Sequence, residues 1–253
     1  MNKSSPLADA AKTRDGPYHA GVRPRDAATL IIVRFDADAP RILMGRRHEA
    51  HSFMPGKFVF PGGRVDRADY GLSGISDLAP ETRGLLLARM NGRPSHRRAR
   101  AIALAAIREA FEETGILVGQ QAAKGSAIPR SASWRPFFDH GVVPDVEPLG
   151  LIARAITPPG MVRRFDTRFF LTEARAIAGQ VTPPSNELET PSWFTFDEAR
   201  RSDIPTITAT ILDLAEHRLD ELRSGGLRPQ APFLYFRHGR RVIEQIEPTE
   251  AGT

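Results

Sequence analysis

The stretch that most constrains this chain is residues 99–117, ARAIALAAIREAFEETGIL, which has the periodicity of an amphipathic α-helix. Three of its carboxylates are spaced i, i+3 and i+4, which places them on one face of such a helix. They belong to Glu109, Glu112 and Glu113. The apolar residues on roughly the opposite side are Leu104, Ile107 and Phe111. We therefore expect an apolar face and an acidic face, with Gly115 ending the helix.

The acidic face has two interpretations. Like charges at helical spacing destabilise a helix by a few tenths of a kcal/mol per pair, so the cluster by itself does not stabilise the fold. It is either a solvated acidic surface or a ligand set for a hard divalent cation, which takes oxygen ligands and favours carboxylates. The rest of the sequence has to decide between them.

Composition limits the classes to which the protein can belong. Its 253 residues can bury a sizeable core, and the absence of cysteine excludes disulfides and thiolate metal sites. No apolar run reaches the length of a membrane span, and residues 1–17 lack the apolar centre of a signal peptide. We expect a cytoplasmic protein with no membrane partner. The net charge of +5 comes without a long basic run, so we expect no nucleic-acid partner.

The chain predicts a single domain over residues 26–246, because no repeat or low-complexity linker interrupts it. Residues 1–25 are polar and rich in Pro, Gly, Ala and Asp, which predicts a flexible N-terminal arm. Residues 247–253 predict a frayed tail.

The first strands lead into a glycine turn. Residues 27–35 and 41–47 are largely β-branched or apolar and predict a hairpin or two adjacent strands. The second strand closes with Arg46, Arg47 and His48, which form either an exposed basic strand end or an anion-binding rim; Arg46 is the candidate substrate contact. A short strand then runs into Gly62 and Gly63, which permit close approach of the backbone to a ligand. Such a loop can fold over a phosphate or present a carbonyl to a metal ion.

Gly63, Asp69 and residues 108–116, REAFEETGI, together resemble the box motif of the Nudix hydrolases. The family pattern is Gly, five residues, Glu, seven residues and Arg-Glu-U-x-Glu-Glu-x-Gly-U, where U is apolar. The second half matches at Arg108, Glu109, Glu112, Glu113, Gly115 and Ile116. Asp69 stands where Glu is usual, and 38 residues separate it from Arg108.

The insertion, at about residues 70–98, does not exclude a folded box. Lengthening this connection to 38 residues costs roughly 1.5 kcal/mol of loop-closure free energy, which a folded protein can absorb. Its apolar residues predict a short amphipathic helix: Leu78, Leu85, Leu86 and Met90. We expect the insertion to pack beside the site as a lid or wall; the alternative is a surface excursion with no role in the site.

The resemblance implies an α/β (α+β) fold, the Nudix fold, in which a mixed β-sheet lies between α-helices. It also implies Mg²⁺- or Mn²⁺-dependent hydrolysis of the phosphoanhydride of a nucleoside diphosphate linked to another moiety. The enlarged box is similar to the branch that includes peroxisomal acyl-CoA diphosphatases and bacterial relatives. Residues 44–63 loosely resemble the CoA signature of CoA-cleaving members. (Acyl-)CoA is therefore a candidate substrate, beside ADP-ribose, dinucleotides and nucleotide sugars.

Family roles follow from the matching positions. The metal-ligating positions fall on Glu109, Glu112, Glu113 and the carbonyl of Gly63. Glu109 is alternatively the general base. Arg108 cannot act as a base, and the resemblance implies that it holds the box loop to the helix by pairing with Asp69 or Glu109. Because Asp69 is one methylene shorter than the usual Glu, we expect that pair to be loose or bridged by water.

Downstream of the box, residues 185–199, SNELETPSWFTFDEA, are similar to a Nudix region in which an acidic loop precedes a Trp-bearing strand and a helix. In several members a glutamate of this loop is a further metal ligand or the general base. We expect Glu187 in that role, because Glu189 lies nearer the strand. Arg163 and Arg164 either contact a substrate phosphate or decorate a strand entrance.

The remaining patterns predict strands at residues 149–157 and 165–174, one helix at 205–223 and a hairpin at 231–246. The aromatic residues expected in the core or an interface are Trp134, Phe137 and Phe138. The oligomeric state stays open, with a homodimer included.

Other functions would require other features. A non-catalytic Nudix-fold regulator that binds a nucleotide or DNA has no need of intact glutamates. An RNA-decapping enzyme should carry a stronger basic path than this sequence has. A Nudix-fold isomerase acting on isoprenoid diphosphate would want a reactive cysteine, and this chain has none.

Overall fold

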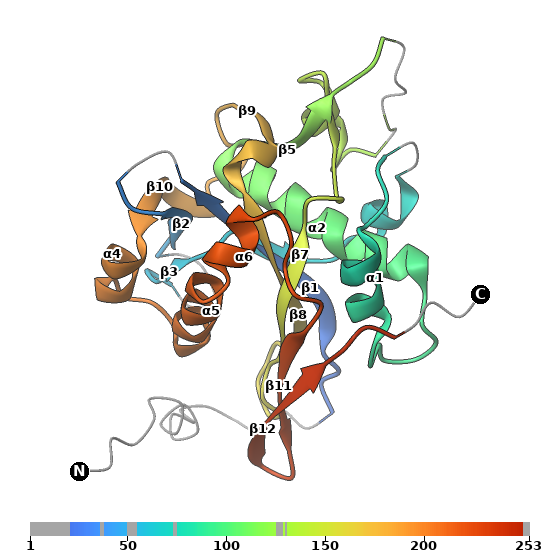
Figure 1. Ribbon diagram of the computed structural model, residues 1–253, viewed down its shortest axis with the longest axis vertical. Coiled ribbons are helices and arrows are strands. Elements are labelled where there is room, and N and C mark those ends of the chain that lie inside the picture. The colour runs from blue at the N-terminus through green and yellow to red at the C-terminus, as the bar shows by residue number, and fades with distance from the viewer. Residues whose placement is uncertain are drawn as a thin grey trace.

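The computed structural model describes residues 21–35, 38–49, 55–72, 75–124, 129 and 131–249. Most of the predicted N-terminal arm, and residues 50–54 of the segment that resembles a CoA signature, lie outside these ranges. The described chain forms a nine-stranded mixed sheet and a three-stranded sheet, with helices packed around them (Figure 1).

The large sheet has the strand order β10-β2-β1-β8-β7-β11-β12, with β3 paired to β2 and β4 paired to β1. Its strands are β1 (Arg25–Arg34), β2 (Arg41–Arg47), β3 (Phe58–Val59), β4 (Gly62–Arg64), β7 (Gly150–Ile156), β8 (Phe165–Glu173), β10 (Leu188–Thr195), β11 (Ala231–Arg237) and β12 (Arg240–Ile246). The small sheet has the order β6-β5-β9. Its strands are β5 (Ile116–Gln121), β6 (Val142–Pro144) and β9 (Ile177–Gln180). The predicted hairpins β1–β2 and β11–β12 are confirmed.

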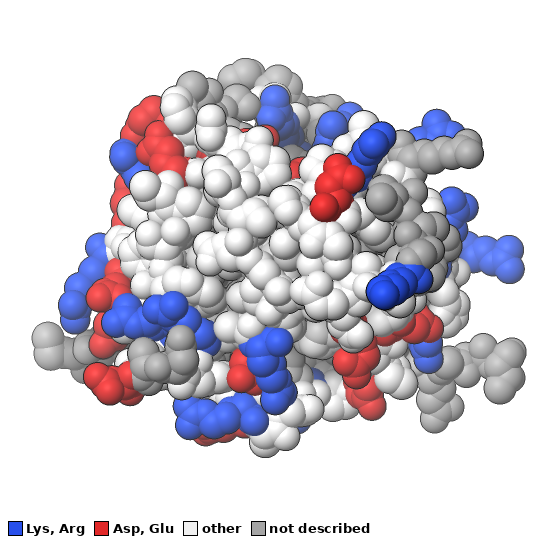
Figure 2. Space-filling model, turned by 90° about the horizontal axis from the view of Figure 1, so that it is seen from above, with Lys and Arg blue, Asp and Glu red and all other residues white. Residues whose placement is uncertain are grey.

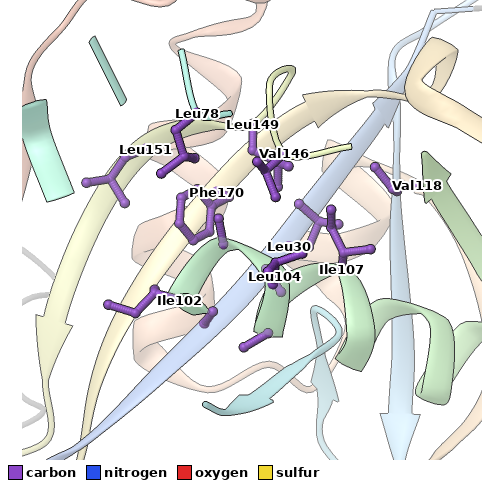
Figure 3. Close-up of a cluster of buried hydrophobic side chains, with 14 of the residues drawn as sticks. Leu30, Leu78, Ile102, Leu104, Ile107, Val118, Val146, Leu149, Leu151 and Phe170 are labelled. Carbon is purple, nitrogen blue, oxygen red and sulfur yellow. The ribbon is translucent and has the colours of Figure 1, made fainter. Parts of the chain in front are cut away.

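The helices cover both faces of the large sheet. They are α1 (Pro80–Leu87), α2 (His96–Thr114), α3 (Arg135–Phe138), α4 (Phe196–Arg201), α5 (Thr206–Glu216) and α6 (Leu219–Arg223), with 3₁₀ turns η2 (Arg67–Gly71) and η3 (Ala174–Ala176). One apolar core joins the sheet to α1, α2 and α3, and Figure 3 shows part of it around Leu104 and Phe170. A second core joins the opposite face to α4, α5 and α6. The predicted mixed sheet between helices is therefore confirmed.

Strand β1 lies in the middle of the large sheet and is apolar on both faces, because each face meets a helical layer. It pairs in parallel with β8, with Arg25 opposite Phe165, and antiparallel with β2 and β4. The glycine turn of the box is thus an extra strand beside β1, with Gly63 opposite Ala28. This pairing holds the turn directly beneath α2.

Helix α2 begins at His96, before the predicted residue 99, because the Ser95 hydroxyl accepts a hydrogen bond from the Arg98 N–H as an N-cap. It ends as predicted at Gly115, which has φ of 72°. A Cβ on Gly115 would lie 1.9 Å from the carbonyl oxygen of Val181, so glycine is required there. The helix is buried on nearly every side, including at Ile102. Its acidic face is therefore largely covered.

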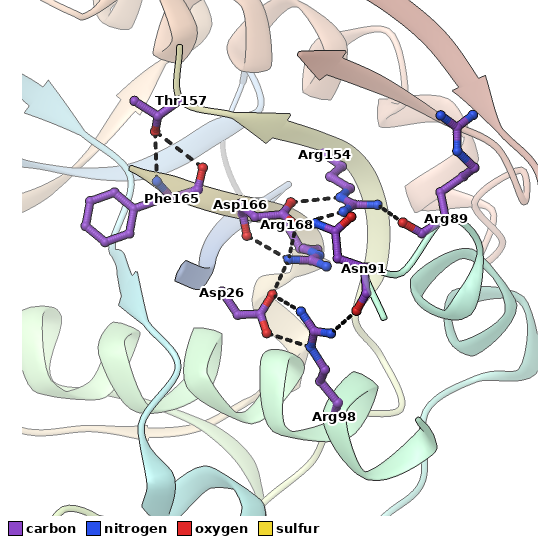
Figure 4. Close-up of polar contacts among 9 residues, drawn as sticks. All are labelled: Asp26, Arg89, Asn91, Arg98, Arg154, Thr157, Phe165, Asp166 and Arg168. Atoms are coloured by element: carbon purple, nitrogen blue, oxygen red, sulfur yellow. Dashed lines mark hydrogen bonds and ion pairs between the residues drawn. The ribbon is translucent and has the colours of Figure 1, made fainter. Parts of the chain in front are cut away.

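The insertion folds into the domain. Its predicted apolar helix is α1, and the apolar residues named for it, Leu78, Leu85, Leu86 and Met90, are all buried. Beyond α1, a buried polar network ties the insertion to the sheet (Figure 4). Arg154 donates 2.8 Å to the carbonyl of Arg89 and forms a 2.7 Å ion pair with Asp166, while Arg98 forms a 2.7 Å pair with Asp26. That the insertion also walls or covers the site stays a prediction.

One prediction near the C-terminus is wrong in part. The single helix expected at residues 205–223 is split into α5 and α6, because Arg218 leaves the helical conformation and donates to the carbonyls of Arg228 and Gln230. Of the tail expected to fray, the structure describes residues 247–249, where Thr249 N donates 3.4 Å to the carbonyl of Gly84. The fraying stays a prediction. Within the described ranges, no helix is long and apolar enough to cross a membrane.

Candidate active site

The three glutamates lie on the last turns of α2, against the glycine turn. The backbone N–H of Gly62 donates 2.9 Å to Oε2 of Glu113. A Cβ on Gly63 would lie 2.5 Å from the carboxyl carbon of Glu109, and one on Gly62 would lie 2.5 Å from the carbonyl oxygen of Ala28. Both glycines are therefore needed for the close approach of β4 to β1 and α2.

Arg108 joins the two halves of the box with a buried guanidinium. Its Nε and Nη2 donate 3.0 and 3.2 Å to the two carboxylate oxygens of Asp69, and Nη2 also donates 2.9 Å to the carbonyl of Arg64. Its Nη1 donates 2.9 Å to Glu109 and 3.0 Å to Glu112. The expectation of a loose or water-bridged pair with Asp69 is wrong, because this pair is direct and bidentate.

The 3₁₀ turn η2 explains how the shorter carboxylate reaches Arg108. Asp69 is the third residue of a capping box, so its Oδ2 accepts a 2.7 Å hydrogen bond from the backbone N–H of Asp66. The turn thereby carries the side chain into the interior, where it is 1 % exposed. A second donor, Nε1 of Trp134, lies 3.0 Å from Oδ1 of Asp69. Sequence reasoning placed Trp134 in the core but missed this contact.

Burial raises the pKa of all three helix glutamates. It raises the pKa of Glu109 to about 7, against the opposing effect of the Arg108 guanidinium. It also raises the pKa of Glu112, with the same guanidinium opposing. Burial, followed by the neighbouring Glu109, raises the pKa of Glu113 well above its ordinary value. Oε1 of Glu113 is buried without a hydrogen-bond partner.

The loop before β10 brings Glu187 to this cluster. Its backbone is fastened to the end of α2, since Val181 N donates 2.9 Å to the carbonyl of Gly115 and Ser185 N donates 3.0 Å to the carbonyl of Glu112. The charge of Glu187 contributes to the raised pKa of all three helix glutamates. Glu189 instead lies 3.8 Å from Arg46 and 3.7 Å from His48. That Glu187, and not Glu189, is the metal ligand or general base stays a prediction.

The arginines predicted to contact substrate lie in different surroundings. Arg46 forms a 2.5 Å ion pair with Glu49 and donates 3.1 Å to the carbonyl of Gly56. Arg163 is exposed, whereas Arg164 donates to the carbonyls of Thr157 and Val22 and so supports the start of β1. Their binding of substrate stays a prediction.

Arg47 follows Arg46 at the end of β2, where the sequence left open an exposed basic strand end or an anion-binding rim. Its charge lowers the pKa of Glu113, opposing the effect of burial. Side chains alternate between the two faces of a strand, so Arg46 and Arg47 of β2 point to opposite sides. The alternation follows from the strand itself, but which of the two side chains lies on the side of Glu113 depends on the partner strands.

A cavity of about 520 Å³ lies beside the loop that carries Glu187. It is lined by residues that include His48, Thr182, Ser185, Asn186, Glu189 and Pro191. Figure 2 shows another view of the surface, in which basic side chains stand around a largely uncharged centre and alternate with acidic ones.

Nudix hydrolases are among the solved structures that this fold resembles. A NUDIX hydrolase from Alicyclobacillus acidocaldarius matches 78 % of this chain and 93 % of its own, with a TM-score of 0.58 and 24 % identity. The chain has the Nudix fold. No family model matches the sequence.

Two further Nudix structures show weaker similarity. The NUDIX domain of Shewanella oneidensis NrtR, complexed with ADP ribose, matches 78 % of this chain and 90 % of its own, with a TM-score of 0.43 and 10 % identity. A MutT NUDIX hydrolase from Burkholderia pseudomallei matches 76 % of this chain and 98 % of its own, with a TM-score of 0.41 and 19 % identity.

Proposed function

We propose that this protein is a divalent-metal-dependent hydrolase that cleaves the phosphoanhydride of a nucleoside diphosphate linked to another moiety. The observation that carries the proposal is the buried, unpartnered Oε1 of Glu113 beside Glu109 and Glu112, on a helix end that faces two glycines. A purely structural helix gains nothing from burying carboxylates whose pKa values are all raised.

The donor set fits Mg²⁺ or Mn²⁺, because these ions favour carboxylate and carbonyl oxygens. The residues that would hold the ion are Glu109, Glu112, Glu113 and the carbonyl of Gly63. Within the described ranges, no three Asp, Glu or His side chains converge as a finished metal site. Nη1 of Arg108 holds Oε1 of Glu109 and Oε2 of Glu112. A bound ion would take the other oxygen of each carboxylate.

The chain's own groups divide the remaining work. A bound Mg²⁺ or Mn²⁺ supplies charge that polarises a phosphoryl oxygen and orients an attacking water. Arg108 fixes the box loop to α2 and neutralises part of the acidic cluster. Glu187 is exposed and lies near the cluster, so it can accept the proton of the attacking water; Glu109 is the second candidate for this general base. Arg47, and by the sequence prediction Arg46, Arg163 and Arg164, would contact the substrate's phosphates.

The favoured substrate class is (acyl-)CoA, on the resemblance of the enlarged box to acyl-CoA diphosphatases, with action in the cytoplasm. ADP-ribose, dinucleotides and nucleotide sugars share the same phosphoanhydride and are the competitors to test. All of them bring negative charge to an acidic cluster, so each requires the metal ion for binding.

The test is a substrate panel with Mg²⁺ or Mn²⁺, read as phosphate released after phosphatase treatment. CoA carries a phosphate that phosphatase removes by itself, so CoA products have to be separated by chromatography. We expect metal-dependent cleavage of at least one compound, and none by the Glu113→Gln variant. Tight binding of a nucleotide without turnover would refute the hydrolase and favour the regulator.

A further inference from the structure

Trp134 stands out because its indole N–H is aimed at a carboxylate of the box from outside the box. Its ring is 0 % exposed, and Nε1 lies 3.0 Å from Oδ1 of Asp69. The two residues are 65 positions apart in sequence. A buried indole N–H needs an acceptor, but a backbone carbonyl would serve as well as this carboxylate.

The ring of Trp134 is held in place by an aromatic cluster. Its centroid lies 5.5 Å from that of Phe137 and 6.3 Å from that of Phe138, in edge-to-face contacts. Phe137 in turn lies 5.3 Å from Phe111 of α2. The donor is thus fixed relative to the same helix that carries the glutamates.

Asp69 has all its acceptor positions engaged. Oδ1 accepts from Nε of Arg108 and from Trp134, while Oδ2 accepts from Nη2 of Arg108 and from the backbone of Asp66. Removal of one donor from a buried carboxylate leaves part of its charge uncompensated. The carboxylate would then be free to move relative to Arg108.

Any movement of the Arg108 guanidinium also changes its hydrogen bonds to Glu109 and Glu112. The same guanidinium binds Asp69 through Nε and Nη2 and binds Glu109 and Glu112 through Nη1. Because the guanidinium is planar, a tilt at the Asp69 edge displaces the opposite edge. The indole is therefore connected to the candidate metal ligands through three successive hydrogen-bonded steps, by way of Asp69 and Arg108.

We propose that Trp134 is a positioning residue of the metal site, acting through Asp69 and Arg108. The inference rests on the proposed metal-dependent function. The indole N–H fixes the Asp69 carboxylate. The fixed carboxylate keeps the Arg108 guanidinium in the orientation in which Nη1 reaches Glu109 and Glu112.

The experiment measures Mn²⁺ binding by calorimetry, without substrate, for the variants Trp134→Phe, Asp69→Asn and the double variant. Phe keeps the aromatic packing and removes the donor. Since groups that orient metal ligands typically contribute 10- to 100-fold to affinity, we expect Trp134→Phe to weaken binding by roughly tenfold. In the double variant the Trp134 change should add almost nothing to the effect of Asp69→Asn, because the connection is already broken.

Two controls separate positioning from packing. Trp193→Phe changes the other tryptophan, which lies in β10, and should leave Mn²⁺ affinity unchanged. Phe138→Leu loosens the aromatic cluster without removing the hydrogen bond, so it should lower the melting temperature and preserve affinity. If Trp134→Phe does not fold, the test uses the indole N–H resonances of the wild-type protein in NMR spectra. Mg²⁺ should then shift the Trp134 resonance more than the Trp193 resonance.

The outcomes distinguish this inference from the proposed function. Three results would each overturn the positioning role while leaving the hydrolase intact. Trp134→Phe binds Mn²⁺ with wild-type affinity, or its effect adds fully to that of Asp69→Asn, or the Trp134 indole resonance does not shift with Mg²⁺. A wild-type protein that binds no Mn²⁺ would overturn both.

Discussion

Without divalent ions, the glutamate cluster should destabilise the fold increasingly as the pH rises. The pKa of each helix glutamate is raised, so the folded protein retains protons that the unfolded chain has already released. The corresponding stability is fully present below the ordinary pKa of 4.5 and is lost as the pH rises through the folded value. For Glu109 that window ends at about 7.

The size of the effect follows from that window. A pKa that moves from 4.5 to about 7 corresponds to on the order of 3 kcal/mol, because each factor of ten in proton affinity is worth about 1.4 kcal/mol. Glu113 acts in the same direction. For a domain of this length, 3 kcal/mol is roughly 6–12 °C in melting temperature. The pKa of Asp26 is lowered, so its contribution to folding stability is lost only in acid and does not hide the fall in stability at higher pH.

The assay is thermal and urea unfolding of metal-free protein at about pH 5.5 and about pH 8, where the linkage predicts a lower melting temperature at the higher pH. Excess Mg²⁺ at the higher pH should restore the loss, since a ligand of the folded state stabilises it. Glu109→Gln is the matched variant: it should flatten the pH dependence and make the metal-free protein more stable than wild type at about pH 8. A metal-free wild type that is as stable at the higher pH, with Glu109→Gln unchanged, would refute the reasoning.

Three further changes test other parts of the site. Glu113→Gln should lower kcat by at least about 10²-fold with an intact circular dichroism spectrum, and normal turnover would exclude Glu113 as a ligand. Gly63→Ala adds a Cβ whose three nearest atoms belong to the Glu109 carboxyl, at the end of a flexible side chain, so steady-state activity should fall at least about tenfold while the fold persists; Gly71→Ala, in open space, should match wild type. Asp166→Asn leaves the buried Arg154 without its charged partner and should cost about 3–5 kcal/mol in urea unfolding, whereas an effect below 1 kcal/mol would contradict a structural role for this pair.

Local sequence patterns predicted much of the fold. The hairpins at β1–β2 and β11–β12 follow from apolar strands around short turns, and His238 and Gly239 both have the positive φ that such a turn needs. The failures have tertiary causes. Nothing in the periodicity of residues 205–223 shows that Arg218 will bind carbonyls of a later loop. Likewise, an acidic helix face gives no sign that β4 will cover it.

The box motif identified its own members but not their supports. Glu113 and Gly62 are named by the motif, and the structure brings them together. Trp134 and Arg47 are outside it. The hydrogen bond of Trp134 to Asp69, and the effect of the Arg47 charge on the pKa of Glu113, depend on where distant segments cross the core. No spacing rule links residue 134 to residue 69, because the loops between them can vary in length without changing the contact.

The insertion does not keep the two halves of the box apart in the fold. A connection lengthened to 38 residues costs roughly 1.5 kcal/mol in closure, which is smaller than the 3–5 kcal/mol lost on breaking one buried ion pair. Here the connection is closed more than once: Asp69 pairs with Arg108 at the site, and Arg98 pairs with Asp26 where the insertion returns. The structure around the insertion therefore places the two halves of the box together, and the distance between them in sequence ceases to matter for the chemistry.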